Sequence, residues 1–120
     1  MTNKANKILI TGGAGYIGSS VVERLVKTKC KVIIVDNLKR GNRKLINKKT
    51  KFVKADINNT RVIRQIILKN NIDTIVHLAG LASVAESQKF KKRYFLNNIK
   101  GTLSILKACK NSRVKSFIYS

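Results

Sequence analysis

The sequence predicts an α/β fold built on a doubly wound parallel sheet, and three observations predict it. Short apolar runs rich in Val and Ile recur along the chain, and they hardly alternate with polar residues. Strands covered on both faces have this composition. Amphipathic helical patterns separate the runs, and a glycine-rich turn joins the first run to the first helical pattern. Strands that alternate with helices form βαβ units with right-handed crossovers.

The apolar runs predict five strands, which we place at residues 7–11, 31–35, 51–54, 74–78 and 116–119. Three stripes with steps of three and four residues predict the helices between them. Each stripe is expected to be buried against the sheet; they consist of Val21, Val22, Leu25 and Val26, then Val62, Ile63, Ile66 and Ile67, then Leu96, Ile99, Leu103 and Leu106. The expected strand order is 3-2-1-4-5, truncated after the fifth strand.

The length of 120 residues predicts one domain, so we expect a cofactor domain at 1–120 that is incomplete and lacks a substrate-binding domain. The polar segment 37–50 is interpreted as a surface connection. No apolar run approaches the roughly 20 residues of a membrane helix, and the start does not resemble a signal peptide. Cys30 and Cys109 lie far apart and form no C-x-x-C pair. Reduced thiols in a cytoplasmic protein, with no membrane partner, are the expectation.

The charge is unusual, because the chain has 26 Lys and Arg residues and only 5 Asp and Glu residues, for a formal net charge of +21. This balance suggests either a polyanionic partner or a compositional drift toward Lys, Asn and Ile. The basic residues are spread along the chain, and aromatic residues do not interleave with them as they do in single-strand binders. We therefore expect no specific nucleic-acid partner, although nonspecific anion binding should be easy.

The strongest motif is the glycine-rich segment 11–18, T-G-G-A-G-Y-I-G, which follows the first strand and opens the first helix. Its glycines satisfy G-x-G-x-x-G in the context that a dinucleotide-binding turn requires. Glycine allows the tight turn and lets the backbone approach a pyrophosphate, whose charge is received by the free amides of the helix start. Gly12, Gly15, Tyr16, Ile17 and Gly18 are the candidate contacts.

Asp36 ends the second strand, 18 positions after Gly18. A carboxylate there accepts hydrogen bonds from the ribose hydroxyls of adenosine and repels a 2′-phosphate, which favours NAD over NADP. The basic Lys39 and Arg40 nearby could instead accommodate that phosphate, so NADP stays the alternative. We predict NAD as the cofactor and no metal site.

In these motifs the chain resembles the extended short-chain dehydrogenases/reductases, a Rossmann-type family, and within it the NAD-dependent epimerase/dehydratase group typified by UDP-glucose 4-epimerases. The resemblance covers nearly the whole chain in order. Besides 11–18, it rests on D-N-L at 36–38, D-I at 56–57, H-L-A-G-L at 77–81 with S-V-A-E-S at 83–87, N-N-I-K-G-T at 97–102 and V-K-S-F-I-Y-S at 114–120. It implies further cofactor contacts at Asn37, Leu38, Asp56, Ile57, Leu78, Ala79, Gly80, Leu81 and Asn98.

Some of these residues also fit plainer roles. Asp56 could be a loop acid or the cap of the following helix, and Asn98 could simply hydrogen-bond between helix and loop. His77 is expected to be a packed histidine at a strand end, and not an acid or base. Ala82 stands where glucose epimerases often carry lysine, so the sugar preference stays open.

The resemblance implies a parent enzyme that oxidises C4 of a UDP-sugar transiently with NAD and so inverts it, and that can form a homodimer. In the family a Ser or Thr and a Tyr-x-x-x-Lys pair perform the proton transfers. Neither Tyr16, Tyr94 nor Tyr119 is followed four positions later by Lys, so we assign no catalytic residue here. The expected function is the NAD-binding part of a nucleotide-sugar epimerase of the UDP-glucose/UDP-galactose or UDP-N-acetylhexosamine 4-epimerase type, inactive alone. A nucleotide-sugar 4,6-dehydratase or reductase and a non-catalytic NAD-binding module are the alternatives.

Overall fold

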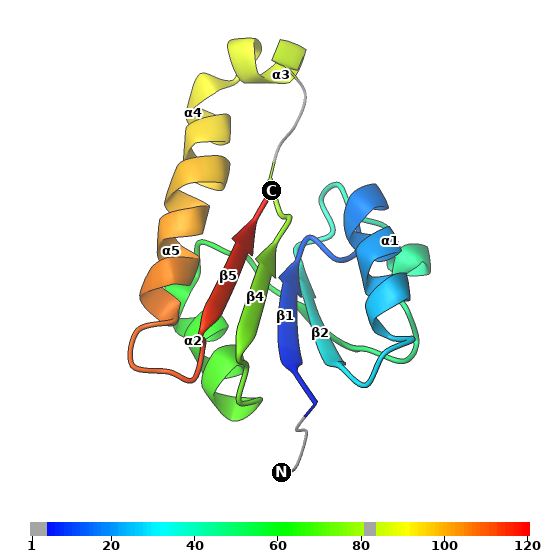
Figure 1. The fold of residues 1–120 in the computed structure, drawn as a ribbon. Helices are drawn as coiled ribbons and strands as arrows, with labels where there is room; N and C mark the ends of the chain where they lie inside the picture. The colour runs from blue at the N-terminus through cyan, green and yellow to red at the C-terminus, as the bar shows by residue number, and fades with distance from the viewer. Residues whose placement is uncertain (1–4, 81–83) are drawn as a thin grey trace.

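A computed structural model describes residues 5–80 and 84–120 (Figure 1). The strands and helices that the apolar runs and stripes predict are present, and short helical segments at 43–45, 84–89 and 91–94 are added to them. In chain order they are β1 (Lys7–Thr11), α1 (Tyr16–Leu25), β2 (Lys31–Asp36), the 3₁₀ turn η1 (Arg43–Leu45), β3 (Lys51–Lys54), α2 (Thr60–Lys69), β4 (Thr74–His77), α3 (Val84–Lys89), α4 (Lys91–Tyr94), the π-helical segment η2 (Phe95–Lys100), α5 (Gly101–Ala108) and β5 (Ser116–Tyr119).

The five strands form one parallel sheet in the order β3-β2-β1-β4-β5, which confirms the predicted topology. The strand bounds differ from the expected ones by a single residue at two places: β2 includes Asp36, and β4 ends at His77. The carboxyl ends of β1, β2 and β4 therefore meet at one edge of the sheet (Figure 1). Ligands of open parallel sheets bind at that edge.

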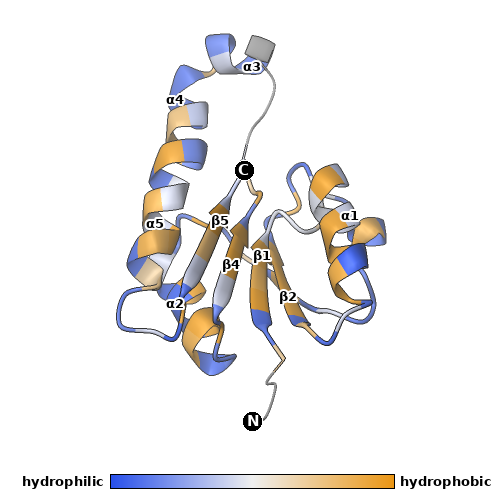
Figure 2. Ribbon diagram, viewed as in Figure 1, coloured by the Kyte–Doolittle hydropathy of each residue, from blue (hydrophilic) through white to orange (hydrophobic). Residues whose placement is uncertain are grey.

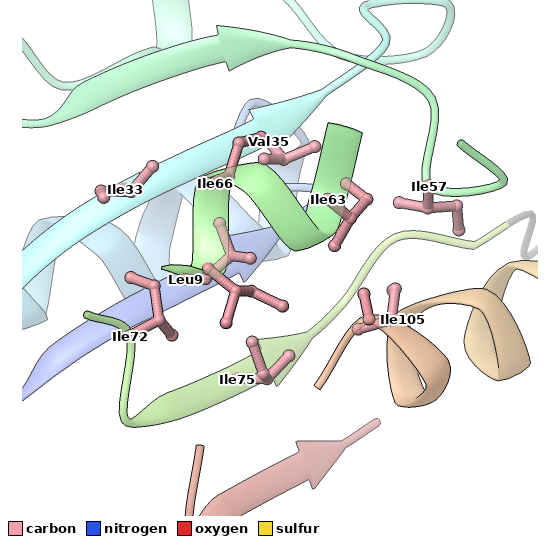
Figure 3. Packing of buried hydrophobic residues seen from close by; sticks show 11 residues of the cluster. Leu9, Ile33, Val35, Ile57, Ile63, Ile66, Ile72, Ile75 and Ile105 are labelled. Carbon is pink, nitrogen blue, oxygen red and sulfur yellow. The ribbon is translucent and has the colours of Figure 1, made fainter. Parts of the chain in front are cut away.

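The core has two layers because successive side chains of a strand point to opposite faces of the sheet. On one face, Leu9, Ile33 and Ile75 pack with α2 and α5 (Figure 3). On the other face, Ile10 and Ile34 pack with α1. The strands β1 and β2 are hydrophobic along most of their length (Figure 2), as the Val- and Ile-rich runs predict.

The third predicted stripe is wrong about which face of its helix is buried. Instead, α5 packs through small or short residues: a Cβ on Gly101 would lie 2.4 Å from Cδ1 of Ile57, and the Ser104 hydroxyl meets that of Thr60 at 2.5 Å. The buried residues of α5 are Gly101, Ser104, Ile105 and Ala108, whereas Leu96 is only half-buried and Ile99, Leu103 and Leu106 are 50%, 52% and 46% exposed. Close packing of a helix against its neighbours requires small side chains. The buried face of α5 is therefore less apolar than its exposed face.

The segments α4, η2 and α5 follow one another without a break and run alongside the sheet (Figure 1). The π-helical segment η2 carries Asn97 and Asn98, and π-helical turns within helices are frequent at functional sites. None of the helices in the described part of the chain is long and apolar enough to span a membrane.

Candidate functional site: a cavity at the carboxyl edge of the sheet

The glycine-rich turn lies tightly between two neighbouring strands. The Gly12 amide donates to the carbonyl of Val35 at 2.8 Å, and the φ of Gly12 is +77°, in the region that favours glycine. A Cβ on Gly12 would lie 2.8 Å from the amide nitrogen of Ala79. The turn is therefore held against both β2 and the loop that follows β4, and only glycine fits at this position.

The start of α1 presents its backbone without a side-chain cap. Gly15 occupies the N-cap position in an extended conformation, and glycine has no side chain that could cap the helix. The first amides of a helix have no intrahelical partners and lie at the positive end of its dipole. Tyr16 and Ile17 are 86% and 67% exposed, so the access to this end is open. The helix start can therefore receive an anion.

Asp36 lies at the carboxyl end of β2 and is only 9% exposed. One of its carboxylate oxygens accepts a hydrogen bond from the Ala14 amide at 3.1 Å, and the other accepts one from the Leu38 amide at 2.8 Å. Leu38 has a φ of +63°, an uncommon conformation for a residue other than glycine. These contacts fix the Asp36 carboxylate beside the glycine-rich turn.

The turn and Asp36 line one cavity of about 420 Å³, a volume within the range of small-molecule sites. Eight of the predicted site residues line it: Gly12, Gly15, Asp36, Asn37, Ile57, Leu78, Ala79 and Gly80. Tyr16, Ile17, Gly18, Leu38, Asp56 and Asn98 are not among the lining residues, and Leu81 lies outside the described residues. Sequence reasoning did not place Val35, Lys39, Arg40, Gly41, Ala55, Arg93 and Asn97 in the lining.

Two of the predicted residues outside the lining have clear local roles. Asp56 is exposed, and its carboxylate accepts from the Asn58 amide at 2.9 Å. The cap of α2 is Asn59, whose side chain accepts from the Val62 amide, so the capping alternative for Asp56 is wrong. The side chain of Asn98 packs over Gly80, because a Cβ there would lie 3.2 Å from Asn98 Oδ1. Asn98 thus joins the long helix to the loop after β4.

An ion pair links the loop after β2 to α3, next to the cavity. The Arg40 guanidinium donates to the Glu86 carboxylate, which also accepts from the Tyr94 hydroxyl at 3.3 Å. The hydrogen bond from Arg40 holds the pKa of Glu86 below its ordinary value, and the same contact raises the pKa of Arg40. Arg40 is one of the lining residues, so the pair joins two otherwise separate parts of the chain at the cavity.

His77 is almost fully buried, at 1% exposure, in a chain of hydrogen bonds behind the cavity. The Thr102 hydroxyl donates to the Asn98 carbonyl at 2.7 Å, so it accepts the proton of His77 Nε2 at 2.9 Å. His77 Nδ1 then accepts from the Thr11 hydroxyl at 2.6 Å. This arrangement requires a neutral ring, and burial lowers the pKa of His77 to about 4. The prediction of a packed histidine is confirmed.

The chain is similar in sequence and in structure to UDP-glucose 4-epimerases. The chain is 40% identical to a UDP-glucose 4-epimerase of Lactobacillus helveticus over 114 residues, which cover 95% of the chain and 34% of the relative. The crystal structure of Thermotoga maritima UDP-glucose 4-epimerase with UDP-glucose superposes with a TM-score of 0.91 at 37% identity, over 94% of this chain and 37% of that one. The crystal structure of Thermus thermophilus UDP-glucose 4-epimerase in complex with NAD superposes with a TM-score of 0.88 at 32% identity, over 92% of this chain and 36% of that one.

Fold and cavity together define a Rossmann-like α/β unit of the kind that forms the amino-terminal part of these enzymes. The model of the NAD dependent epimerase/dehydratase family matches residues 8–120, and the chain belongs to that family. It spans about a third of the length of these relatives.

Proposed function

We propose that this chain forms the NAD-binding part of a nucleotide-sugar 4-epimerase that acts on a UDP-sugar. The observation that carries the proposal is the joint lining of one cavity by the glycine-rich turn and Asp36. A dinucleotide needs both features, one for its pyrophosphate and one for its adenosine ribose. Support for the substrate class comes from the relatives alone, one of which was solved with UDP-glucose. Cytoplasmic location and homodimeric assembly are proposed on the family resemblance only.

The residues present fit NAD. Close backbone approach at Gly12 and Gly18 leaves no room for a Cβ, whereas a Cβ on Gly15 would meet only one atom, the Gly12 carbonyl oxygen at 3.3 Å. Gly15 therefore leaves space for a phosphate beside the helix start, where the amides of Tyr16 and Ile17 would hold it. When bound, NAD would supply a hydride acceptor and donor. In the proposal Asp36 binds the ribose, Ile57 lies against the adenine, and the loop residues Leu78, Ala79 and Gly80 border the remainder.

The charge around the cavity favours NAD over NADP. Asp36 lines the cavity, and its carboxylate would repel a 2′-phosphate. Of the two basic residues that could accommodate that phosphate, Lys39 and Arg40, Arg40 is already paired with Glu86. Lys39 and Arg93 leave the lining basic overall, which suits the pyrophosphate that both dinucleotides carry.

Binding of NADH, followed by its fluorescence, tests this assignment. We expect saturable binding, and we expect Asp36→Asn to weaken it about tenfold, because the neutral amide makes weaker hydrogen bonds to hydroxyl groups. The same substitution should bring the affinity for NADPH close to that for NADH. Glu23→Gln, an exposed acid on α1, removes the same charge and serves as the control. No saturable NADH binding by the folded chain would refute the proposed cofactor role.

The 120 residues are expected to show no epimerase turnover. General acid–base catalysis contributes about 10²–10⁴-fold in enzymes, and this sequence holds no Tyr-x-x-x-Lys pair to provide it. Purified chain with UDP-galactose and NAD should therefore form no UDP-glucose, as measured by chromatography of the sugar nucleotides. Turnover above that of a heat-denatured sample would show that other residues of this chain move the proton.

A further inference from the structure

A second cavity, of about 460 Å³, lies at the amino ends of the strands, at the opposite edge of the sheet from the glycine-rich turn. Its most frequent lining residue is lysine, and no carboxylate lines it. Along the sequence the basic residues are spread out. In the fold, five lysines gather around this cavity: Lys7, Lys31, Lys49, Lys51 and Lys69.

The strand register brings these lysines together. Lys7 and Lys31 are the first residues of β1 and β2, and they are direct partners in the parallel pairing, roughly 5 Å apart along the hydrogen-bonding direction. Lys51 begins β3 on the next strand along. Figure 2 shows the hydrophilic starts of β1 and β2 side by side. Like charges directly opposite each other on neighbouring strands destabilise a sheet, so this arrangement is unfavourable without a counter-charge.

Little in the protein offsets this charge. Among the described residues, none of the five lysines forms an ion pair, and the Lys51 ammonium donates only to the neutral amide of Asn70, at 3.3 Å. Asp73 is near, but its carboxylate accepts from the Lys7 backbone amide at 2.9 Å and from the Thr74 hydroxyl at 2.7 Å, and it does not line the cavity. The carboxyl end of α2 favours one cation in its last turn, which accounts for Lys69 alone.

We propose that this cavity binds a compact oligophosphate, a short chain of linked phosphates whose charge the ammonium groups of the lining lysines would neutralise. The cavity volume suits a small molecule. No aromatic side chain lines it, so it offers no platform for stacking the bases of a single-stranded nucleic acid. Free inorganic oligophosphate and the phosphate chain of a nucleoside triphosphate share the chemistry that the lysines recognise. The site is separate from the cofactor cavity, because the two lie at opposite edges of the sheet.

Amide chemical shifts of the ¹⁵N-labelled chain, titrated with sodium tripolyphosphate at about 0.15 M salt, locate the binding. We expect saturating shifts at Lys31, Lys51 and Asn71. Shifts restricted to the glycine-rich turn, or a non-saturating drift over the whole surface, would overturn the proposal. ATP titrated in parallel distinguishes the two sources: tighter binding than tripolyphosphate indicates a nucleotide, and equal binding indicates the phosphate chain alone. Failure of both to bind contradicts the site.

Charge-matched variants separate a site from general attraction. The double variant Lys31→Gln and Lys51→Gln should weaken tripolyphosphate binding by roughly 10- to 100-fold, because two charge-assisted hydrogen bonds are lost. Lys107→Gln with Lys110→Gln removes the same charge from exposed positions on and after α5, and should change the affinity by less than about twofold. Equal weakening by both pairs would show nonspecific attraction only. Without anion, the Lys31→Gln and Lys51→Gln double variant should melt at the same temperature as the unsubstituted chain or at a higher one, because removing two charges reduces the repulsion among the lysines.

Discussion

Gly18→Ala is expected to remove most of the stability of the fold, with a loss of about 4 kcal/mol or more in the free energy of unfolding. The new Cβ would lie 2.0 Å from the Gly12 carbonyl oxygen and 3.0 Å from the Gly13 Cα. Both contacts are with backbone, so no side-chain rotation relieves them, and α1 would have to move away from β1. Chemical denaturation followed by far-UV circular dichroism measures the loss.

Gly15→Ala is the matched control, because it adds the same methyl group three residues earlier. The φ at Gly15 is −83°, which suits alanine, and the Cβ would approach only the Gly12 carbonyl oxygen, at 3.3 Å. Stability should change by less than about 1 kcal/mol, while NADH affinity falls because the methyl group occupies part of the proposed phosphate space. Equal stability of the two variants would contradict the close packing of α1 on the turn.

The second large effect is a loss of stability as the pH falls from 6.5 to 4. The unfolded chain binds a proton at His77 with a pKa near 6.5, whereas the buried ring has a pKa of about 4. The unfolded state therefore holds more protons in this range, and stability falls as the pH decreases. The contribution of the neutral His77 ring to the free energy of unfolding is complete above pH 6.5. At pH 4 about 3 kcal/mol of it is lost. Denaturation midpoints across this range measure it.

His77→Gln tests the assignment, since glutamine has no charge to gain and can still donate and accept hydrogen bonds. The variant should be less stable at pH 7 and should lose most of the slope between pH 6.5 and 4. Lowered carboxyl pKa values, such as that of Glu86, act mainly below this window. An unchanged slope in the variant would mean that another group titrates there. The rings of Phe117 and Tyr119 pack beside that of His77, with centroids 6.1 and 5.6 Å away.

Local patterns were sufficient for most of the fold. Apolar runs without alternation gave five parallel strands, because strands covered on both faces need apolar side chains throughout. The glycine spacing, together with an acid at the end of the second strand, predicted that Gly12, Gly15 and Asp36 would meet at one cavity, and they line it. These signals depend on a few neighbouring residues and on the topology of a βαβ unit, so the sequence alone expresses them.

Other features depend on which surfaces meet. The apolar stripe of Ile99 and Leu103 has helical spacing, but periodicity cannot say which face of a helix meets the sheet; close packing at Gly101 and Ser104 turned that stripe outward. Arg93 and Asn97 reach the cavity only because the long helix passes beside the loop after β4.

The sequence by itself determined the strand order, the glycine-rich turn and the acid beside it, because short-range spacing encodes them. Only the tertiary structure decided which face of α5 is buried, how Arg40 pairs with Glu86, and that Lys7, Lys31 and Lys51 converge. Each of these depends on contacts between residues distant in the chain, whose energies are set by the register and packing of whole elements rather than by any local pattern.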